Sequence, residues 1–133
     1  MNAILNTLLV IFIFIAAGCA TPVAIDPSSG QQQNAKYQGG YFYGPLDAEI
    51  GEVFRVAIVE LDAMGYFRTG ELHKEDSITI YGRKQGDEKF TLRTYYSTSR
   101  KDEGATSMIR IRIGQFGNLA ESQLIYARIR DAL

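Results

Sequence analysis

The stretch Ser107–Ile113, SMIRIRI, alternates apolar and charged side chains along its length. Such a period of two is typical of a β-strand that has one buried face. We therefore predict a strand in which one set of side chains enters a core and the other faces solvent. The inward set comprises Ile109, Ile111 and Ile113, and the outward set comprises Met108, Arg110 and Arg112.

Earlier runs show related patterns. Ser77–Arg83 alternates isoleucines with polar residues, and Lys89–Ser97 places Phe90, Leu92, Thr94 and Tyr96 on one side and Lys89, Thr91, Arg93 and Tyr95 on the other. Tyr66–Leu72 is expected to be extended and broken by Gly70, with a charged turn at 73–76. Short loops between successive strands favour antiparallel pairing.

Two helices are expected to cover this sheet. Asp47–Met64 repeats apolar residues at helical spacing, with Asp47 as the N-cap and Gly65 as the left-handed residue after the helix. Asn118 and Glu121 form a capping box for a last helix whose narrower stripe consists of Ser122, Ile125, Tyr126, Ile129 and Leu133. A short aromatic strand, Tyr41-Phe42-Tyr43, precedes the first helix and is expected to end at a Gly44-Pro45 turn.

These elements predict an α+β fold. Their order is strand, helix, four strands and helix, and the natural packing is an antiparallel sheet with both helices on one face. The alternation does not fix the order of the strands within the sheet.

The apolar run Leu8–Cys19, LLVIFIFIAAGC, ends at small residues and at the single cysteine. It is typical of a bacterial lipoprotein signal, cleaved between Gly18 and Cys19, with the Cys19 thiol carrying the lipid. The start of the chain lacks the usual Lys or Arg. The alternative is an uncleaved anchor, because residues 1–18 are just long enough to span a bilayer.

The chain is thus divided into three parts. Residues 1–18 are predicted to be the signal peptide, residues 19–40 a flexible tether, and residues 41–133 a single domain. The tether is rich in Pro, Gly, Ser and Gln and has few large apolar residues, so it has little to offset the entropy of ordering. About 20 such residues give an end-to-end distance of roughly 25 Å.

Composition argues against several classes of function. The formal net charge is −1, which gives no long-range attraction to nucleic acid. With Cys19 lipidated, His73 is left as the single histidine and no thiol remains, so we expect no metal site and no cofactor. The acidic residues near His73, namely Glu71, Glu75 and Asp76, are interpreted as a solvated turn, and no enzymatic activity is expected.

Several motifs resemble one family. They are the signal with its cysteine, Tyr43-Gly44-x-Leu46, Ala57, Leu61 and Gly65, Ile109-Arg110-Ile111-x-x-Gly114-x-Phe116-Gly117, and then Ser122, Ile125, Ile129 and Leu133. Together they resemble the small bacterial lipoproteins of the domain-of-unknown-function family DUF3568. The resemblance implies a small helix-on-sheet fold, and the order of its elements is similar to helix-grip and TATA-binding-protein-like architectures. It implies no catalytic residues.

Two groups of residues are candidate interaction sites. Arg93, Tyr95, Arg110 and Arg112, with Tyr81, are expected to share the outer sheet face, which either binds a partner or is simply solvated. Phe116 lies in the loop Gly114–Gly117 and either folds back onto the core or forms an exposed aromatic tip.

We therefore expect a non-enzymatic envelope lipoprotein, held to the membrane by the lipid on Cys19, that binds an envelope protein. The alternative is a carrier of a small apolar ligand, with a cavity lined by Phe54, Ile58, Phe90, Ile111 and Ile129. In a Gram-negative cell we expect the outer membrane with the domain in the periplasm, because Ala20 is not the Asp that retains such proteins at the inner membrane. The oligomeric state stays open.

Overall fold

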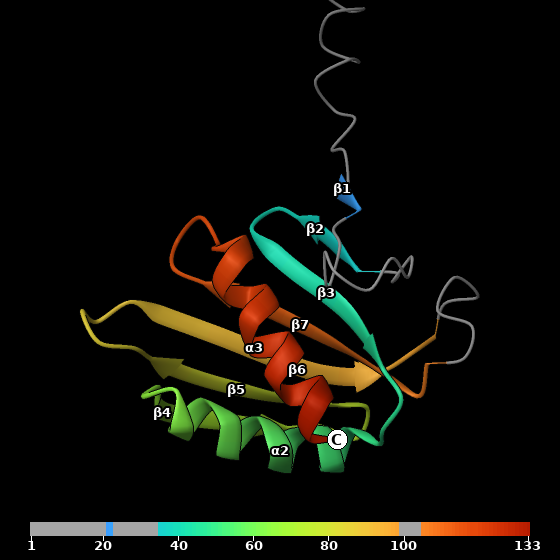
Figure 1. Ribbon diagram of the computed structural model, residues 1–133. Coiled ribbons are helices and arrows are strands. Elements are labelled where there is room, and N and C mark those ends of the chain that lie inside the picture. Colours follow the sequence, from blue (N-terminus) through green and yellow to red (C-terminus); the bar gives the residue numbers. More distant parts are fainter. Residues whose placement is uncertain (1–20, 23–34, 99–104) are drawn as a thin grey trace, which may run out of the picture.

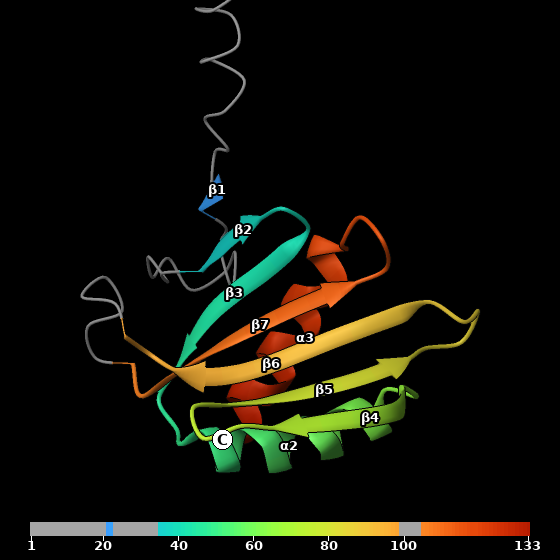
Figure 2. The ribbon, with the colours of Figure 1, turned by 180° about the vertical axis from the view of Figure 1, so that it is seen from behind.

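The computed structural model describes residues 21–22, 35–98 and 105–133. These residues form one antiparallel sheet in the order β1-β2-β3-β7-β6-β5-β4, with two helices on one of its faces (Figure 1; Figure 2 shows the opposite face). The strands are β1 (Thr21–Pro22), β2 (Lys36–Gln38), β3 (Tyr41–Leu46), β4 (Phe67–His73), β5 (Ser77–Arg83), β6 (Lys89–Tyr96) and β7 (Ser107–Ile113). The predicted α+β class is confirmed, and the likeness to helix-grip and TATA-binding-protein-like folds stays a prediction.

The first helix, α2, spans Ile50–Ala63, a shorter range than predicted. Glu49, and not Asp47, is its N-cap, and no side chain caps the helix. The Asp47 carboxylate instead accepts a hydrogen bond from Thr106 Oγ1 at 3.0 Å, which ties the chain before the helix to the start of β7. Gly65 has φ +80°, so the predicted left-handed end of the helix is confirmed.

The second helix, α3, spans Leu119–Ala132 and starts as predicted. Asn118 Oδ1 accepts from the backbone N–H of Glu121 at 3.1 Å. In return, Asn118 Nδ2 donates to Glu121 Oε2 at 3.2 Å. The capping motif therefore fixes where α3 begins.

The core lies between the sheet and the helices. Strand pairing places Phe42, Ile111, Leu92 and Ile80 in one row across four strands, and all four are fully buried. Helix residues pack onto this row and are also fully buried; they are Val53, Ala57, Leu61, Ile125 and Ile129. The predicted inward face of β7 is therefore confirmed. Met108, expected to face solvent, is buried, flanked by Pro45 and Tyr95 on the neighbouring strands.

The predicted end of strand β3 at a Gly44-Pro45 turn is wrong. Both residues continue the strand and pair with Ile109 and Met108 of β7. Proline is tolerated here because β2 pairs only with residues 41–43, so no strand of the described part of the chain lies on the far side of Pro45. Glycine is required because a Cβ at Gly44 would overlap the ring of Tyr126 on α3.

The sheet also includes residues that were assigned to the flexible tether. Lys36–Gln38 pair with Tyr41–Tyr43 through a turn in which Gly39 and Gly40 both have positive φ. Ala35 is 2 % exposed and belongs to the core. The ordered domain therefore begins before residue 41. A tyrosine-rich strand with a Gly-Gly turn was the sequence signal for this hairpin.

Strand β4 forms one edge of the sheet, and all seven of its residues are exposed. Its pairing with β5 shifts between Arg68 and Gly70, which marks a β-bulge at the predicted break. His73 is the last residue of this strand and not part of the turn, because it pairs with Ile78.

The predicted signal peptide, residues 1–18, lies outside the described residues, and so does the predicted lipidation site Cys19. Among the helices that are described, none is long and apolar enough to cross a membrane.

Candidate functional site

The sheet face away from the helices carries a group of arginines and tyrosines. Strand pairing sets Arg93 opposite Arg110, Arg112 opposite Thr91, and Tyr43 opposite Arg110. Lys36 of β2 lies opposite Tyr43. We call this surface the Arg–Tyr face; it consists of Lys36, Tyr41, Tyr43, Arg93, Tyr95, Arg110 and Arg112. Figure 2 shows the side of the sheet to which it belongs.

Tyr41 holds two of the arginines. The guanidinium carbons of Arg110 and Arg112 lie 4.7 Å and 4.8 Å from the centre of its ring. Arg112 Nη1 also donates to the Tyr41 hydroxyl at 3.1 Å, and Nη2 donates to the Gln115 carbonyl. Cation–π contacts of this kind order the guanidinium planes without neutralising their charge.

Arg93 and Lys36 are held in similar ways. The Arg93 guanidinium lies 5.7 Å from the Tyr95 ring centre, and its Nη2 donates to Ser77 Oγ at 3.0 Å. Ser77 Oγ in turn donates to Asp76 Oδ1 at 3.1 Å. Lys36 Nζ lies 5.1 Å from the Tyr43 ring centre. Aromatic or hydroxyl side chains, and not carboxylates, therefore make the contacts that orient these cations.

The charge of this face is unbalanced. No Asp or Glu occupies an outward position in strands β2 to β7, and no ion pair joins Arg93, Arg110 or Arg112 to a described acidic residue. Like charges directly opposite each other destabilise a sheet, and Arg93 and Arg110 are in this position. Their Nε atoms are buried and have no acceptor within the described part of the chain. The two opposed guanidinium groups therefore have no compensating carboxylate among the described residues.

Phe116 is 85 % exposed in the loop between β7 and α3. The expectation that it folds back onto the core is therefore wrong, and the alternative of an exposed tip holds. The next residue, Gly117, packs closely against β2 and its turn, because a Cβ at this position would overlap Gly40 and the hydroxyl of Tyr37. The hydrogen bond from Arg112 to Gln115 links this loop to the edge of the Arg–Tyr face.

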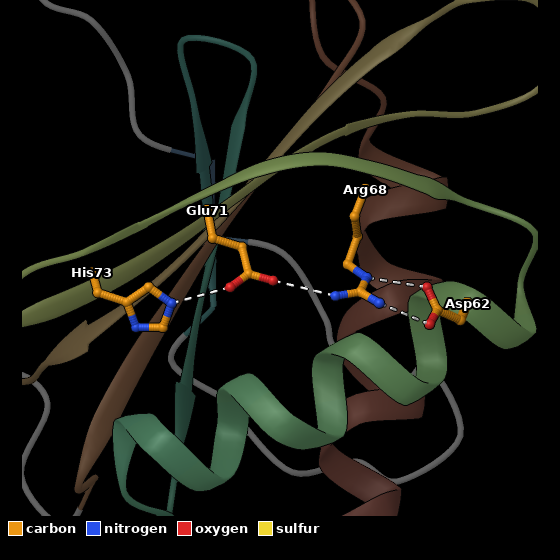
Figure 3. A network of polar contacts seen from close by, with 4 residues as sticks. All are labelled: Asp62, Arg68, Glu71 and His73. Carbon is orange, nitrogen blue, oxygen red and sulfur yellow. Dashed lines mark hydrogen bonds and ion pairs between the residues drawn. The ribbon is translucent and has the colours of Figure 1, made fainter.

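A second polar group lies on the other side of the molecule, between α2 and β4 (Figure 3). Arg68 makes two hydrogen bonds to Asp62, both at 3.3 Å, and one of 3.2 Å to Glu71, whose other oxygen lies 3.1 Å from His73 Nε2. An open hollow of about 610 Å³ adjoins the group and is lined by Asp62, Tyr66, Phe67, Arg68, Gly70 and Glu71. The hydrogen bond with Asp62 raises the pKa of Arg68.

This network connects the end of α2 to the sheet edge. The side chains of Glu71 and His73 are 32 % and 55 % exposed, and solvated ion pairs contribute at most about 1 kcal/mol. The expected solvated character of the acidic cluster near His73 is therefore observed, although His73 itself lies in a strand. Within the described residues, no group of His, Cys, Asp and Glu is arranged to hold a metal ion.

A third network fixes the start of α3. Glu121 accepts hydrogen bonds from the Tyr66 hydroxyl and from Lys84 Nζ, the latter at 2.7 Å. Burial of Glu121 raises its pKa, but the hydrogen bonds from Lys84 and Tyr66 outweigh this, so the pKa is lowered overall. Burial, together with the bond to Glu121, raises the pKa of Tyr66. The network joins three separate segments and has a structural role.

Sequence reasoning found part of the Arg–Tyr face. Arg93, Tyr95, Arg110 and Arg112 lie together as expected, and Tyr81 lies on the same side of the sheet, opposite Thr91. Lys36 was missed because β2 was assigned to the tether. Tyr41 and Tyr43 were missed because the sequence did not place the strand 41–43 next to β7. The alternation Tyr41, Phe42, Tyr43, continued through buried Gly44 and Leu46, was the available signal.

Comparison with known proteins identifies the family. Among curated proteins, none matches this chain. A family model described as "Protein of unknown function (DUF3568)" matches residues 2–132, nearly the whole sequence. The chain therefore belongs to the DUF3568 family, as its sequence motifs predicted.

Proposed function

We propose that this protein is a non-enzymatic envelope lipoprotein that binds an acidic surface of another protein through its Arg–Tyr face. The observation that carries the proposal is the pair Arg93 and Arg110, which lie opposite each other with no described carboxylate between them. Such a pair opposes folding in the free protein. A carboxylate placed between the two guanidinium groups by a partner relieves their repulsion.

The chemistry of the face favours carboxylates. Guanidinium groups form bidentate hydrogen bonds with carboxylates, and planar ordering reduces the entropy lost on binding. Tyr41 orders Arg110 and Arg112, and Tyr95 lies beside Arg93. Tyrosine and arginine are also the residues enriched in protein interfaces. The face therefore combines charge with flat contact area that is already in place.

The position of the domain relative to the membrane is part of the proposal. A lipid on Cys19 anchors the chain, and the sheet begins close to this residue, because Thr21–Pro22 pair with β2 as strand β1. In a Gram-negative cell this places the domain in the periplasm at the outer membrane, since Ala20 and Thr21 follow the cysteine. The partner is then an envelope protein within reach of this short connection.

The alternative function, a carrier of a small apolar ligand, gains no specific support. Phe90, Ile111 and Ile129 are at most 2 % exposed and pack in one cluster, with Phe54 and Ile58 against it. The hollow of about 610 Å³ is open, lies between the end of α2 and β4, has charged walls and is lined by none of these five residues. The carrier function stays an untested prediction.

Neutralisation of the two opposed arginines tests the proposal. The full-length chain and its Arg93→Gln/Arg110→Gln variant are crosslinked in intact cells, and the captured partner is identified and quantified. Loss of an arginine–carboxylate contact weakens binding by at least about tenfold. Arg55→Gln is a control for the loss of an arginine elsewhere on the surface, because Arg55 is exposed on α2, in the layer on the other side of the sheet. Equal capture by the control and the double variant would contradict the proposal.

A further inference from the structure

The exposed side chains of the edge strand β4 form a pattern that is complementary to a second copy of the same strand. Phe67 and Leu72 are 62 % and 43 % exposed, and they pair with Arg83 and Thr79 on the side away from the helices. Arg68 and Glu71 lie on the opposite side, facing α2. The strand thus presents two apolar residues on one face and two opposite charges on the other.

The β-bulge creates this arrangement. Phe67 and Leu72 are five positions apart, so in a regular strand they would point to opposite faces. The extra residue between Arg68 and Gly70 shifts the alternation and returns both to the same face. It also places Arg68 and Glu71, three positions apart, on a common face.

Backbone groups of this edge are available for pairing. Lys74 N–H donates to the Ser77 carbonyl at 2.8 Å, so the hydrogen-bonded pairs between β4 and β5 recur at Leu72 and Gly70. Glu71 and His73 therefore direct their N–H and C=O groups away from β5. No described strand lies on that side.

We propose that two copies of this chain join through β4 in an antiparallel pair, with Phe67 of each copy opposite Leu72 of the other and Arg68 opposite Glu71. In this register both apolar pairs form on one face. On the other face Arg68 of each copy lies opposite Glu71 of the other copy, in addition to its contacts with Asp62 and Glu71 of its own chain. Cross-strand pairs of these kinds each stabilise a sheet. The twofold axis passes between Thr69 and Gly70 of the two strands.

Other registers are less favourable. If Gly70 of one copy lay opposite Gly70 of the other, Arg68 would lie opposite Leu72. These two side chains point to different faces of the strand, so they would not form a cross-strand pair. Glu71 opposite Glu71 places like charges together. Bulges and inward-pointing charges often prevent a sheet edge from pairing with another strand. Here the two charged residues, Arg68 and Glu71, are opposite in sign, and each lies opposite the other across the two copies. They select one register and do not repel a second copy.

The consequence is a continuous sheet across two copies. The twofold axis of such a pair is perpendicular to the sheet, so both Arg–Tyr faces lie on the same side. The helices of both copies cover the other side. The inference does not depend on the proposed function of the Arg–Tyr face.

Disulfide trapping tests this register in the full-length chain. Phe67→Cys and Leu72→Cys variants with different tags are produced together and oxidised, and wild-type chain controls for disulfides through Cys19. A disulfide needs Cα atoms within about 7 Å, so the mixed pair should give at least about tenfold more dimer than either variant alone. Two copies of residue 67 lie roughly 15 Å apart in this register. Val59→Cys with Leu72→Cys controls for random collision, because Val59 is 64 % exposed on α2.

Charge reversal provides the second measurement. Added to both trapping variants, Arg68→Glu should reduce the mixed dimer about tenfold, and Arg68→Glu/Glu71→Arg should restore it. Thermal unfolding of each variant confirms that the fold persists. The proposal is overturned if the mixed pair gives no more dimer than the Val59 control, or if reversal has no effect. A disulfide to a different protein would also overturn it and would indicate strand addition by that protein.

Discussion

The guanidinium of Arg110 lies 4.7 Å from the centre of the Tyr41 ring, and the same ring supports Arg112 at 4.8 Å. One tyrosine thus orders two cations from the neighbouring strand. The backbone sets this geometry, because β3 and β7 pair in a register that fixes Tyr43 opposite Arg110. An aromatic residue at position 41 is therefore central to the Arg–Tyr face, although it contributes no net charge.

The two faces of β7 should differ in their effect on stability. Ile111→Ala removes a fully buried side chain at the centre of the core row and should reduce the free energy of unfolding by about 3 kcal/mol. Arg110→Ala removes a half-buried side chain with one cation–π contact and should change it by less than about 1 kcal/mol. Urea unfolding of the two variants measures the difference. The reverse ranking would show that the faces are assigned incorrectly.

Gly44→Ala should destabilise the domain by about 1–3 kcal/mol, because the added methyl overlaps the Tyr126 ring. Tyr126 cannot easily move, since its hydroxyl donates to the Pro45 carbonyl at 2.5 Å. Gly51→Ala is the control: it lies within α2 with open space around it and should stabilise by about 0.5–1 kcal/mol. Differential scanning calorimetry would show melting temperatures that move in opposite directions. Two shifts of the same sign would contradict the packing of α3 on β3.

Acid should weaken the start of α3. The pKa of Glu121 is lowered in the folded protein, so the unfolded state binds its proton more readily as pH falls. The stabilisation by Lys84 and Tyr66 is present above the usual pKa of 4.5 and is lost as pH falls through the lowered value. The free energy of unfolding, measured from pH 6 to pH 3, should fall more steeply for wild type than for Glu121→Gln. Parallel curves would rule out this role for Glu121.

Lipidation is tested independently of the fold. Cys19→Ala removes the acceptor thiol, so metabolic labelling with a palmitate analogue should lose all signal from the chain, and the signal peptide should stay uncleaved. Cys19→Ala does not change the folded domain, so the variant should unfold at the same temperature as the wild type. Label that persists in Cys19→Ala would contradict a lipid on this residue.

Local patterns in the sequence predicted the layers of the fold. The alternation through Ile109, Ile111 and Ile113 and the cap at Asn118 each depend on neighbouring residues, and both were confirmed. Gly44-Pro45 was wrongly predicted to be a turn. The two residues form a strand because they pair with β7 and because the Tyr126 ring packs against Gly44. Tertiary packing supplies that information.

The Arg–Tyr face was predicted only in part, because local patterns do not specify which strands pair. Arginines on β6 and β7 could be assigned to one face from their alternation alone. Tyr41 and Lys36 join them through the pairing of β2, β3 and β7, which periodicity does not specify. The bulge in β4 was anticipated only as a break at Gly70, and its effect on which side chains share a face required the register with β5.

The central claim is that the Arg–Tyr face contacts an acidic protein partner, and site-specific photocrosslinking in intact cells tests it most directly. A photoreactive amino acid replaces Thr91, which lies between Arg112 and Tyr81 on this face, or Val59 on the exposed side of α2. We predict an adduct with one envelope protein from position 91 that fades as salt is raised, and no such adduct from position 59. Adducts of equal strength from both positions, or from position 59 alone, would contradict the account.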